Sequence, residues 1–128
     1  QSGYWPPGQI LAVEGLLRAN PRPTLDEIQA AIFTPTCATS NCHNGANPSG
    51  GLDLRDADTS FAQLVDVASD DDPMILRVAP GDPDNSYLVQ KIEGTAAQGQ
   101  QMPPGGAAPL SQAEIDAIRQ WITDGAVR

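Results

Sequence analysis

The segment Cys37-Ala-Thr-Ser-Asn-Cys42-His43 contains both cysteines of this 128-residue chain and its only histidine. Four residues separate the two thiols, and the imidazole directly follows the second one. The rest of the chain has to enclose whatever group these two thiols and the imidazole bind.

A Cys-His pair preceded by a nearby cysteine is the attachment signature of covalent haem c. In that arrangement two thiols add to the porphyrin vinyl groups and the imidazole binds the iron. The usual spacer is two residues, whereas here it is four. A longer spacer can bulge while both sulfurs still reach the vinyl groups. We therefore predict one haem c per chain, bound by Cys37, Cys42 and His43.

Two other interpretations of the cysteine segment stay open at this stage. A Cys37–Cys42 disulfide in an exported protein would close a small loop. A zinc site is less well supported, because two thiols and one imidazole leave a structural tetrahedron one ligand short.

The composition indicates one small domain that needs added apolar bulk. Aromatic residues make up only 5% of the chain, and glycine and proline number 12 each. Such a chain would pack weakly by itself, and a buried haem would supply the missing volume. The net charge of −9 argues against nucleic acid or an anionic membrane as a partner. It favours redox proteins that present a basic or neutral docking surface.

The sequence also bears on location. No apolar run approaches the length of a membrane span. The chain begins at Gln1 without an initiator methionine, which fits a processed exported protein. Because haem c is attached outside the bacterial cytoplasm, we expect a periplasmic or extracellular protein.

We divide the chain into an N-terminal arm, residues 1–23, and a haem-binding domain, residues 24–128. The arm contains Trp5-Pro6-Pro7 and an amphipathic helical stretch over residues 10–17. Its apolar side chains would pack either on the domain or on a neighbouring molecule. The second case would produce homo-oligomers or chains of haems.

Capping boxes mark the first and last helices of the domain. In Thr24-Leu-Asp-Glu27 and in Ser111-Gln-Ala-Glu114, hydroxyl and carboxylate satisfy the end amides reciprocally. The first helix is expected to run into the cysteine segment, and the last to close at Gly125. Between them, Pro83-Asp-Asn-Ser86 opens a helix that stops at Gly94.

The middle of the chain is expected to hold short elements. Ser60-Phe-Ala-Gln63 is a further capping signal and predicts a brief helical turn. Residues 64–67 and 75–78 could pair as a short β-hairpin around the acidic tip Asp70-Asp-Asp-Pro73. This tip, with Asp82 and Asp84, could also form a calcium site, although carboxylate-rich turns are usually just solvated.

Four further segments resemble class I c-type cytochromes, in particular the bacterial domains of the planctomycete type. They are Gly50-Gly-Leu-Asp-Leu54, Pro80-Gly-Asp-Pro-Asp-Asn-Ser-Tyr-Leu88, Met102-Pro103-Pro104 and residues 115–126. The resemblance covers roughly residues 25–126, and the four-residue spacer departs from it. It implies an all-α cytochrome c-like fold around one covalently bound haem.

This fold implies a crossing of the first and last helices at one edge of the haem. The crossing would bring together Ile28, Ala31 and Ile32 with Ile118, Trp121 and Ile122. The side chains that we expect to line the haem are Leu52, Leu54, Tyr87, Leu88, Ile92 and Trp121.

The sixth iron ligand is expected to be a methionine, because no second histidine is present. Met102 lies in a loop stiffened by Pro103-Pro104, where the family supplies its thioether. Met74 lies in a hydrophobic run beside the acidic tip and is expected to be a core residue. The predicted metal ligands are therefore His43 and Met102.

By analogy with the family, the carbonyl of Gly50, or one close to it, would accept the second imidazole N–H of His43. Arg55 and Arg77 are candidates for contacts to the haem propionates, but either could equally be a surface cation.

The function expected from these features is one-electron transfer and not enzymatic catalysis. With both axial positions filled, the iron cannot easily bind a substrate, so outer-sphere transfer remains. One alternative is a structural cytochrome that assembles through the arm. Another is a haem peroxidase or gas sensor with an open sixth position, but no second histidine is available as a distal acid–base group.

Overall fold

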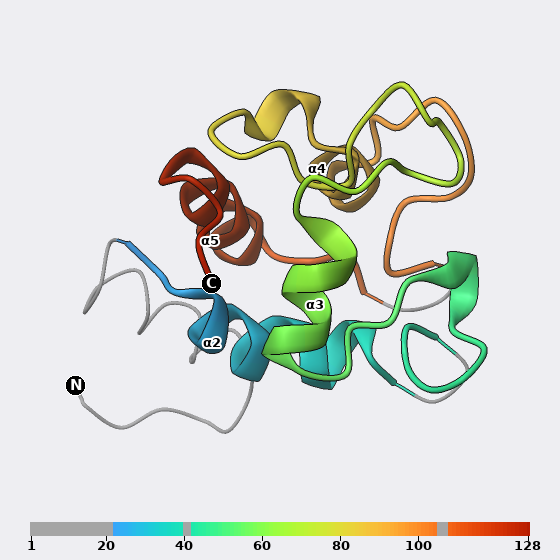
Figure 1. Cartoon of the computed structure of the whole chain (residues 1–128), viewed down its shortest axis with the longest axis horizontal. Helices are drawn as coiled ribbons and strands as arrows, with labels where there is room; N and C mark the ends of the chain where they lie inside the picture. Colours follow the sequence, from blue (N-terminus) through green and yellow to red (C-terminus); the bar gives the residue numbers. More distant parts are fainter. Residues whose placement is uncertain (1–21, 40–41, 105–107) are drawn as a thin grey trace.

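The computed structural model describes residues 22–39, 42–104 and 108–128. Within these ranges it contains helices and turns but no strand, which confirms the all-α prediction (Figure 1). None of the helices in the described ranges is long and apolar enough to cross a membrane. Most of the predicted arm, including its amphipathic stretch, lies outside the described residues. The elements are α2 (Leu25–Ile28), η1 (Gln29–Cys37), η2 (Ser49–Gly51), α3 (Ala57–Leu64), η3 (Pro83–Asn85), α4 (Tyr87–Glu93) and α5 (Gln112–Thr123).

The first helix begins at the predicted capping box and ends at the first thiol. Thr24 Oγ1 accepts the Glu27 N–H at 3.2 Å, and the Thr24 N–H donates to Glu27 Oε1 at 2.9 Å. After one α-helical turn the winding becomes π-helical, with the Ala38 N–H donating to the Phe33 carbonyl at 2.7 Å. π-helical segments are rare in proteins, and those that do occur are frequently found at functional sites. Here the π-helical segment ends at Cys37, the first of the two thiols.

Helix α5 packs across α2 and forms the main core with it (Figure 1). Its own predicted capping box is present, with Ser111 Oγ accepting the Glu114 N–H at 3.1 Å. Gly125 follows the helix with a φ of 110°, which favours glycine. As predicted for the helix crossing, one buried core contains Ile28, Ala31, Ile32, Ile118, Trp121 and Ile122.

Helix α4 agrees with its prediction and α3 does not. The Pro83–Asn85 turn precedes α4, which ends at Gly94 with a φ of 79°. Helix α3 starts at Ala57 and not at Ser60, because Asp56 Oδ1 accepts the Thr59 N–H at 2.7 Å. This bond also lowers the pKa of the Asp56 carboxyl. Ser60 consequently lies inside the helix and is buried.

The predicted β-hairpin is wrong. Two isolated bridges join its segments, one parallel between Val65 and Val78 and one antiparallel between Ala68 and Leu76. The chain direction therefore changes relative to its neighbour within three residues, at Asp66, whose φ is 61°. No regular ladder can pass through such a turn. The segments still lie side by side and hold the acidic tip between them.

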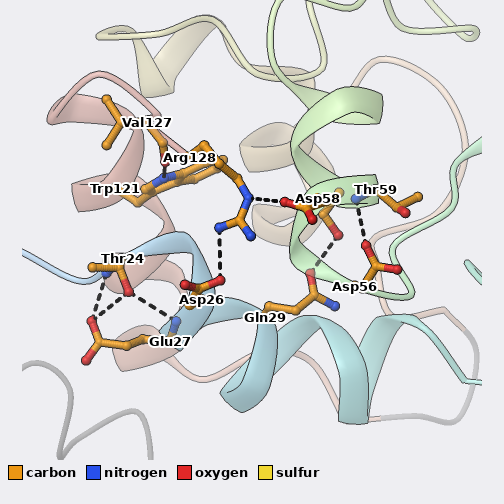
Figure 2. Close-up of polar contacts among 11 residues, drawn as sticks. Thr24, Asp26, Glu27, Gln29, Asp56, Asp58, Thr59, Trp121, Val127 and Arg128 are labelled. Carbon is orange, nitrogen blue, oxygen red and sulfur yellow. Dashed lines mark hydrogen bonds and ion pairs between the residues drawn. The ribbon is translucent and has the colours of Figure 1, made fainter.

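Polar contacts join α2, α3 and the C-terminus (Figure 2). The buried Gln29 amide donates to the Leu54 carbonyl at 2.7 Å and its oxygen accepts the Ser60 hydroxyl at 2.6 Å. Arg128 donates to Asp58 at 2.6 Å and to Asp26 at 2.9 Å. Exposed ion pairs contribute little to stability. The Gln29 contacts are therefore the more important ones, and they fix the chain at Leu54.

We predict that Gln29→Ala lowers the free energy of unfolding by about 1–3 kcal/mol, because it leaves buried polar groups without partners. Urea unfolding of the haem-loaded protein measures the loss. The control is Gln112→Ala, since Gln112 donates to Asp116 on the exposed side of α5, and it should change stability by less than ~0.5 kcal/mol. Equal losses in the two variants would contradict the role assigned to the buried amide.

Candidate functional site

A predominantly apolar cavity lies between the cysteine segment, α3, α4 and the methionine loop. Its free space is about 770 Å³, including the part open to solvent. It is lined by Cys37, His43, Ser49, Gly50, Leu52, Leu54, Leu64, Ser69, Asp70, Asp71, Arg77, Tyr87, Leu88, Lys91, Ile92 and Met102.

The cavity brings together most of the site residues expected from the sequence, but not Cys42 or Trp121. Cys42 is half-buried next to His43 and its N–H donates to the Thr39 carbonyl at 3.0 Å. Trp121 is buried in the helix core, and its indole N–H donates to the Val127 carbonyl at 2.9 Å. The haem-lining role given to Trp121 therefore has no counterpart in this cavity. Leu64, in contrast, lines the cavity from α3 although the sequence placed it in a strand.

The cysteine segment folds back on itself. The His43 N–H donates to the Cys37 carbonyl at 3.0 Å, which brings the two ends of the segment together. The Asn44 side chain donates to the Ala38 carbonyl at 2.9 Å and supports the same turn. The Cys37 and Cys42 thiols are not bonded to each other. The longer spacer is thus compatible with a compact attachment loop.

A backbone carbonyl orients the His43 ring. Nδ1 lies 3.0 Å from the Leu52 carbonyl oxygen. Because a carbonyl can only accept, Nδ1 carries the proton and the Nε2 lone pair is available for a metal. The prediction was the Gly50 carbonyl or one close to it, and the acceptor is the carbonyl two residues further on. The Gly50 carbonyl itself accepts from Arg77 Nη2 at 3.3 Å.

The two methionines occupy very different surroundings. Met102 is half-buried and lines the cavity, and its N–H donates to the Lys91 carbonyl at 2.9 Å. Met74 is 92% exposed, so the prediction of a core residue is wrong. It stands on the acidic turn, where its N–H donates to Asp72 Oδ1 at 3.2 Å. Met74 is not among the residues that line the cavity.

The cations also separate into two kinds. Arg77 is buried at the cavity, where it donates to the Gln63 carbonyl at 2.9 Å and pairs with Asp70 at 3.6 Å. Arg55 is more than half exposed, pairs with Asp53 at 3.4 Å and is not among the residues that line the cavity. Lys91, the chain's only lysine, lines the cavity and was not predicted. Its spacing from Tyr87 and Leu88 on one helix face could have indicated it.

The zinc and calcium alternatives find no support. Burial, followed by the charges of Glu114 and Cys42, raises the pKa of the Cys37 thiol to about 12. Zinc binds thiolates, which this environment disfavours. The described residues contain no group of three or more His, Cys, Asp or Glu side chains that could hold a metal ion. Asp84, part of the proposed calcium site, is paired with Arg119 at 2.8 Å.

The fold and the cavity define a class of protein: a small all-α domain in which a Cys-His segment, apolar side chains and a methionine meet at one cavity. The family model described as planctomycete cytochrome C matches residues 40–106, which is 67 of the 128 residues. The chain belongs to the planctomycete cytochrome c family and is a haem c-binding protein. The matched segment contains Cys42, His43 and Met102, and begins after Cys37. No solved structure matches the chain.

The Tyr87 phenol gives the site a pH-dependent contribution to stability. Burial first, and then its hydrogen bond to Asp71 at 3.1 Å, raise its pKa above the usual value, which is ~10. The folded protein therefore keeps a proton that the unfolded chain releases, so stability falls as the pH rises above about 10.

We predict that Tyr87→Phe flattens this fall, because phenylalanine has no proton to release. Urea unfolding of both proteins between neutral and alkaline pH measures the difference. Stability profiles with the same slope for the wild type and Tyr87→Phe would contradict the assignment.

Proposed function

We propose that the protein carries one electron on a single haem c. Cys37 and Cys42 would hold the haem through thioethers, and His43 and Met102 would bind its iron. The observation that supports this most is the meeting of Cys37, His43 and Met102 on one apolar cavity. When bound, haem supplies the one-electron Fe(III)/Fe(II) couple.

The chain's own residues fit this role. The Leu52 carbonyl holds His43 in the tautomer whose Nε2 can bind iron. The Lys91 carbonyl tethers the backbone of Met102, and a thioether ligand raises the reduction potential. Leucine and isoleucine side chains wall the cavity and exclude water, which disfavours the extra charge of the ferric state. Arg77 and Lys91 are the cations at hand for the propionates.

Electron transfer is favoured over the alternatives by the residues available. A peroxidase or gas sensor would need an open sixth position, and the chain offers no second histidine for distal acid–base chemistry. Assembly through the arm concerns residues that are almost all outside the described part of the chain. Since cytochrome c domains are typically exported, we expect a periplasmic or extracellular protein that serves other redox proteins.

The covalent attachment can be tested by mass. We predict that intact protein carries the mass of one haem and that acid-acetone extraction leaves the colour on the protein. Cys37→Ala should retain haem through the Cys42 thioether alone, since Cys42 adjoins the axial histidine. A Cys37–Cys42 disulfide with no added mass would contradict the proposal.

The sixth ligand can be tested with the two methionines as a matched pair. We predict that Met102→Ala lowers the reduction potential, because ferrous iron loses its thioether, and that the reduced protein then binds carbon monoxide. Met74→Ala should leave both properties unchanged, because that side chain is exposed and outside the cavity. Potentiometry and carbon monoxide titration measure the two effects. The reverse pattern would move the ligand to Met74.

A further inference from the structure

The acidic turn at residues 69–74, here called the rim loop, borders the cavity. Ser69, Asp70 and Asp71 line the cavity directly. On the same loop Met74 is 92% exposed, compared with 64% for Val127, the other large hydrophobic residue exposed in the described ranges. A single exposed apolar side chain is ordinary. The informative feature is that Met74 stands on a loop of which three other residues line the cavity.

The rim loop is held in shape by its own hydrogen bonds. The Ser69 N–H donates to the Ile75 carbonyl at 2.9 Å and closes the base of the loop. Inside it, the Asp71 N–H donates to Ser69 Oγ and the Met74 N–H to Asp72 Oδ1, both at 3.2 Å. A preformed surface loses little freedom when a partner binds. Met74 is therefore presented on a braced turn.

The charge of the rim loop faces outward. The Asp70 side chain is 67% exposed, whereas its partner Arg77 is only 11% exposed and lies beneath it. Asp71 accepts from the Tyr87 hydroxyl, and Asp71 and Asp72 form no ion pair within the described part of the chain. A partner thus meets carboxylates around one apolar side chain, on a chain of net charge −9.

We propose that the rim loop is the docking surface for a basic redox protein. That partner sets lysine or arginine side chains against Asp70 and Asp71 and covers Met74 with an apolar recess. The proposal rests on the electron-carrier function. In the reaction, ferrous iron gives up one electron and becomes ferric, and the oxidised metal centre of the partner gains that electron. A second copy of this chain is a poor occupant, because two acidic rim loops repel each other.

The test uses the haem-loaded full chain and two oxidants in stopped-flow experiments. The first is an oxidised c-type cytochrome with a strongly basic surface. The second is a small neutral quinone of high potential, which takes one electron from the ferrous haem and becomes a semiquinone. The variants are Met74→Ser and the double substitution Asp70→Asn with Asp71→Asn, whose amide oxygens can still face Arg77 and Tyr87. The controls are Val127→Ser and Asp116→Asn, which change an exposed apolar side chain and an exposed charge elsewhere.

We expect the double variant to react about tenfold more slowly with the basic cytochrome at low salt, and the difference to shrink as salt screens the charges. Met74→Ser should react about threefold more slowly at every ionic strength, because it loses apolar contact and not charge. Rates with the neutral quinone should be unchanged in Met74→Ser, and both controls should keep the wild-type rates.

Three results would overturn the docking proposal. One is a wild-type rate with the basic cytochrome in Met74→Ser and in the double variant. Another is an equal fall in Asp116→Asn, which would assign the effect to net charge alone. The third is a wild-type dimer that Met74→Ser abolishes in sedimentation, which would place a second copy on the rim loop. Failure of the wild type to reduce even the quinone would instead contradict the electron-carrier function.

Discussion

The hydrogen bond between the His43 ring and the Leu52 carbonyl is the constraint on which the site depends. It selects the tautomer that leaves Nε2 available. The bond requires the chain to return to the imidazole nine residues later, and the Leu54 N–H donates to the His43 carbonyl at 2.8 Å to secure that return. The Gln29 amide then holds the Leu54 carbonyl from the first helix. Ring orientation is thereby tied to the helix core.

The cavity and the helix core share side chains. Trp121 and Phe33 are fully buried in the core. The same core contains Leu54, Leu64 and Ile92, which also line the cavity. A chain with only 5% aromatic residues leaves this space because it lacks large side chains to fill it. The scarcity of large side chains therefore accounts both for the weak packing expected of the chain alone and for the space that a cofactor can fill.

Local signals were the part of the fold that the sequence could predict. The Thr24 and Ser111 capping boxes act within four residues, so both helix starts were predicted correctly. Asp56 and Ser60 are possible caps one turn apart, and in the structure Asp56 caps the helix while the buried Ser60 donates to Gln29. Asp66 breaks the expected hairpin through a positive φ that side-chain alternation does not reveal.

The site was predictable where one motif contains it and not where distant segments meet. Cys37, Cys42 and His43 form a continuous signal, whereas the exposure of Met74 depends on how the acidic turn is oriented.

The absorption spectra of the purified protein in its ferric and ferrous states test the central claim most directly. We predict a haem c that is low-spin and six-coordinate in both states, with a sulfur-to-iron charge-transfer band in the ferric form. A high-spin ferric spectrum, or one without haem, would contradict the account.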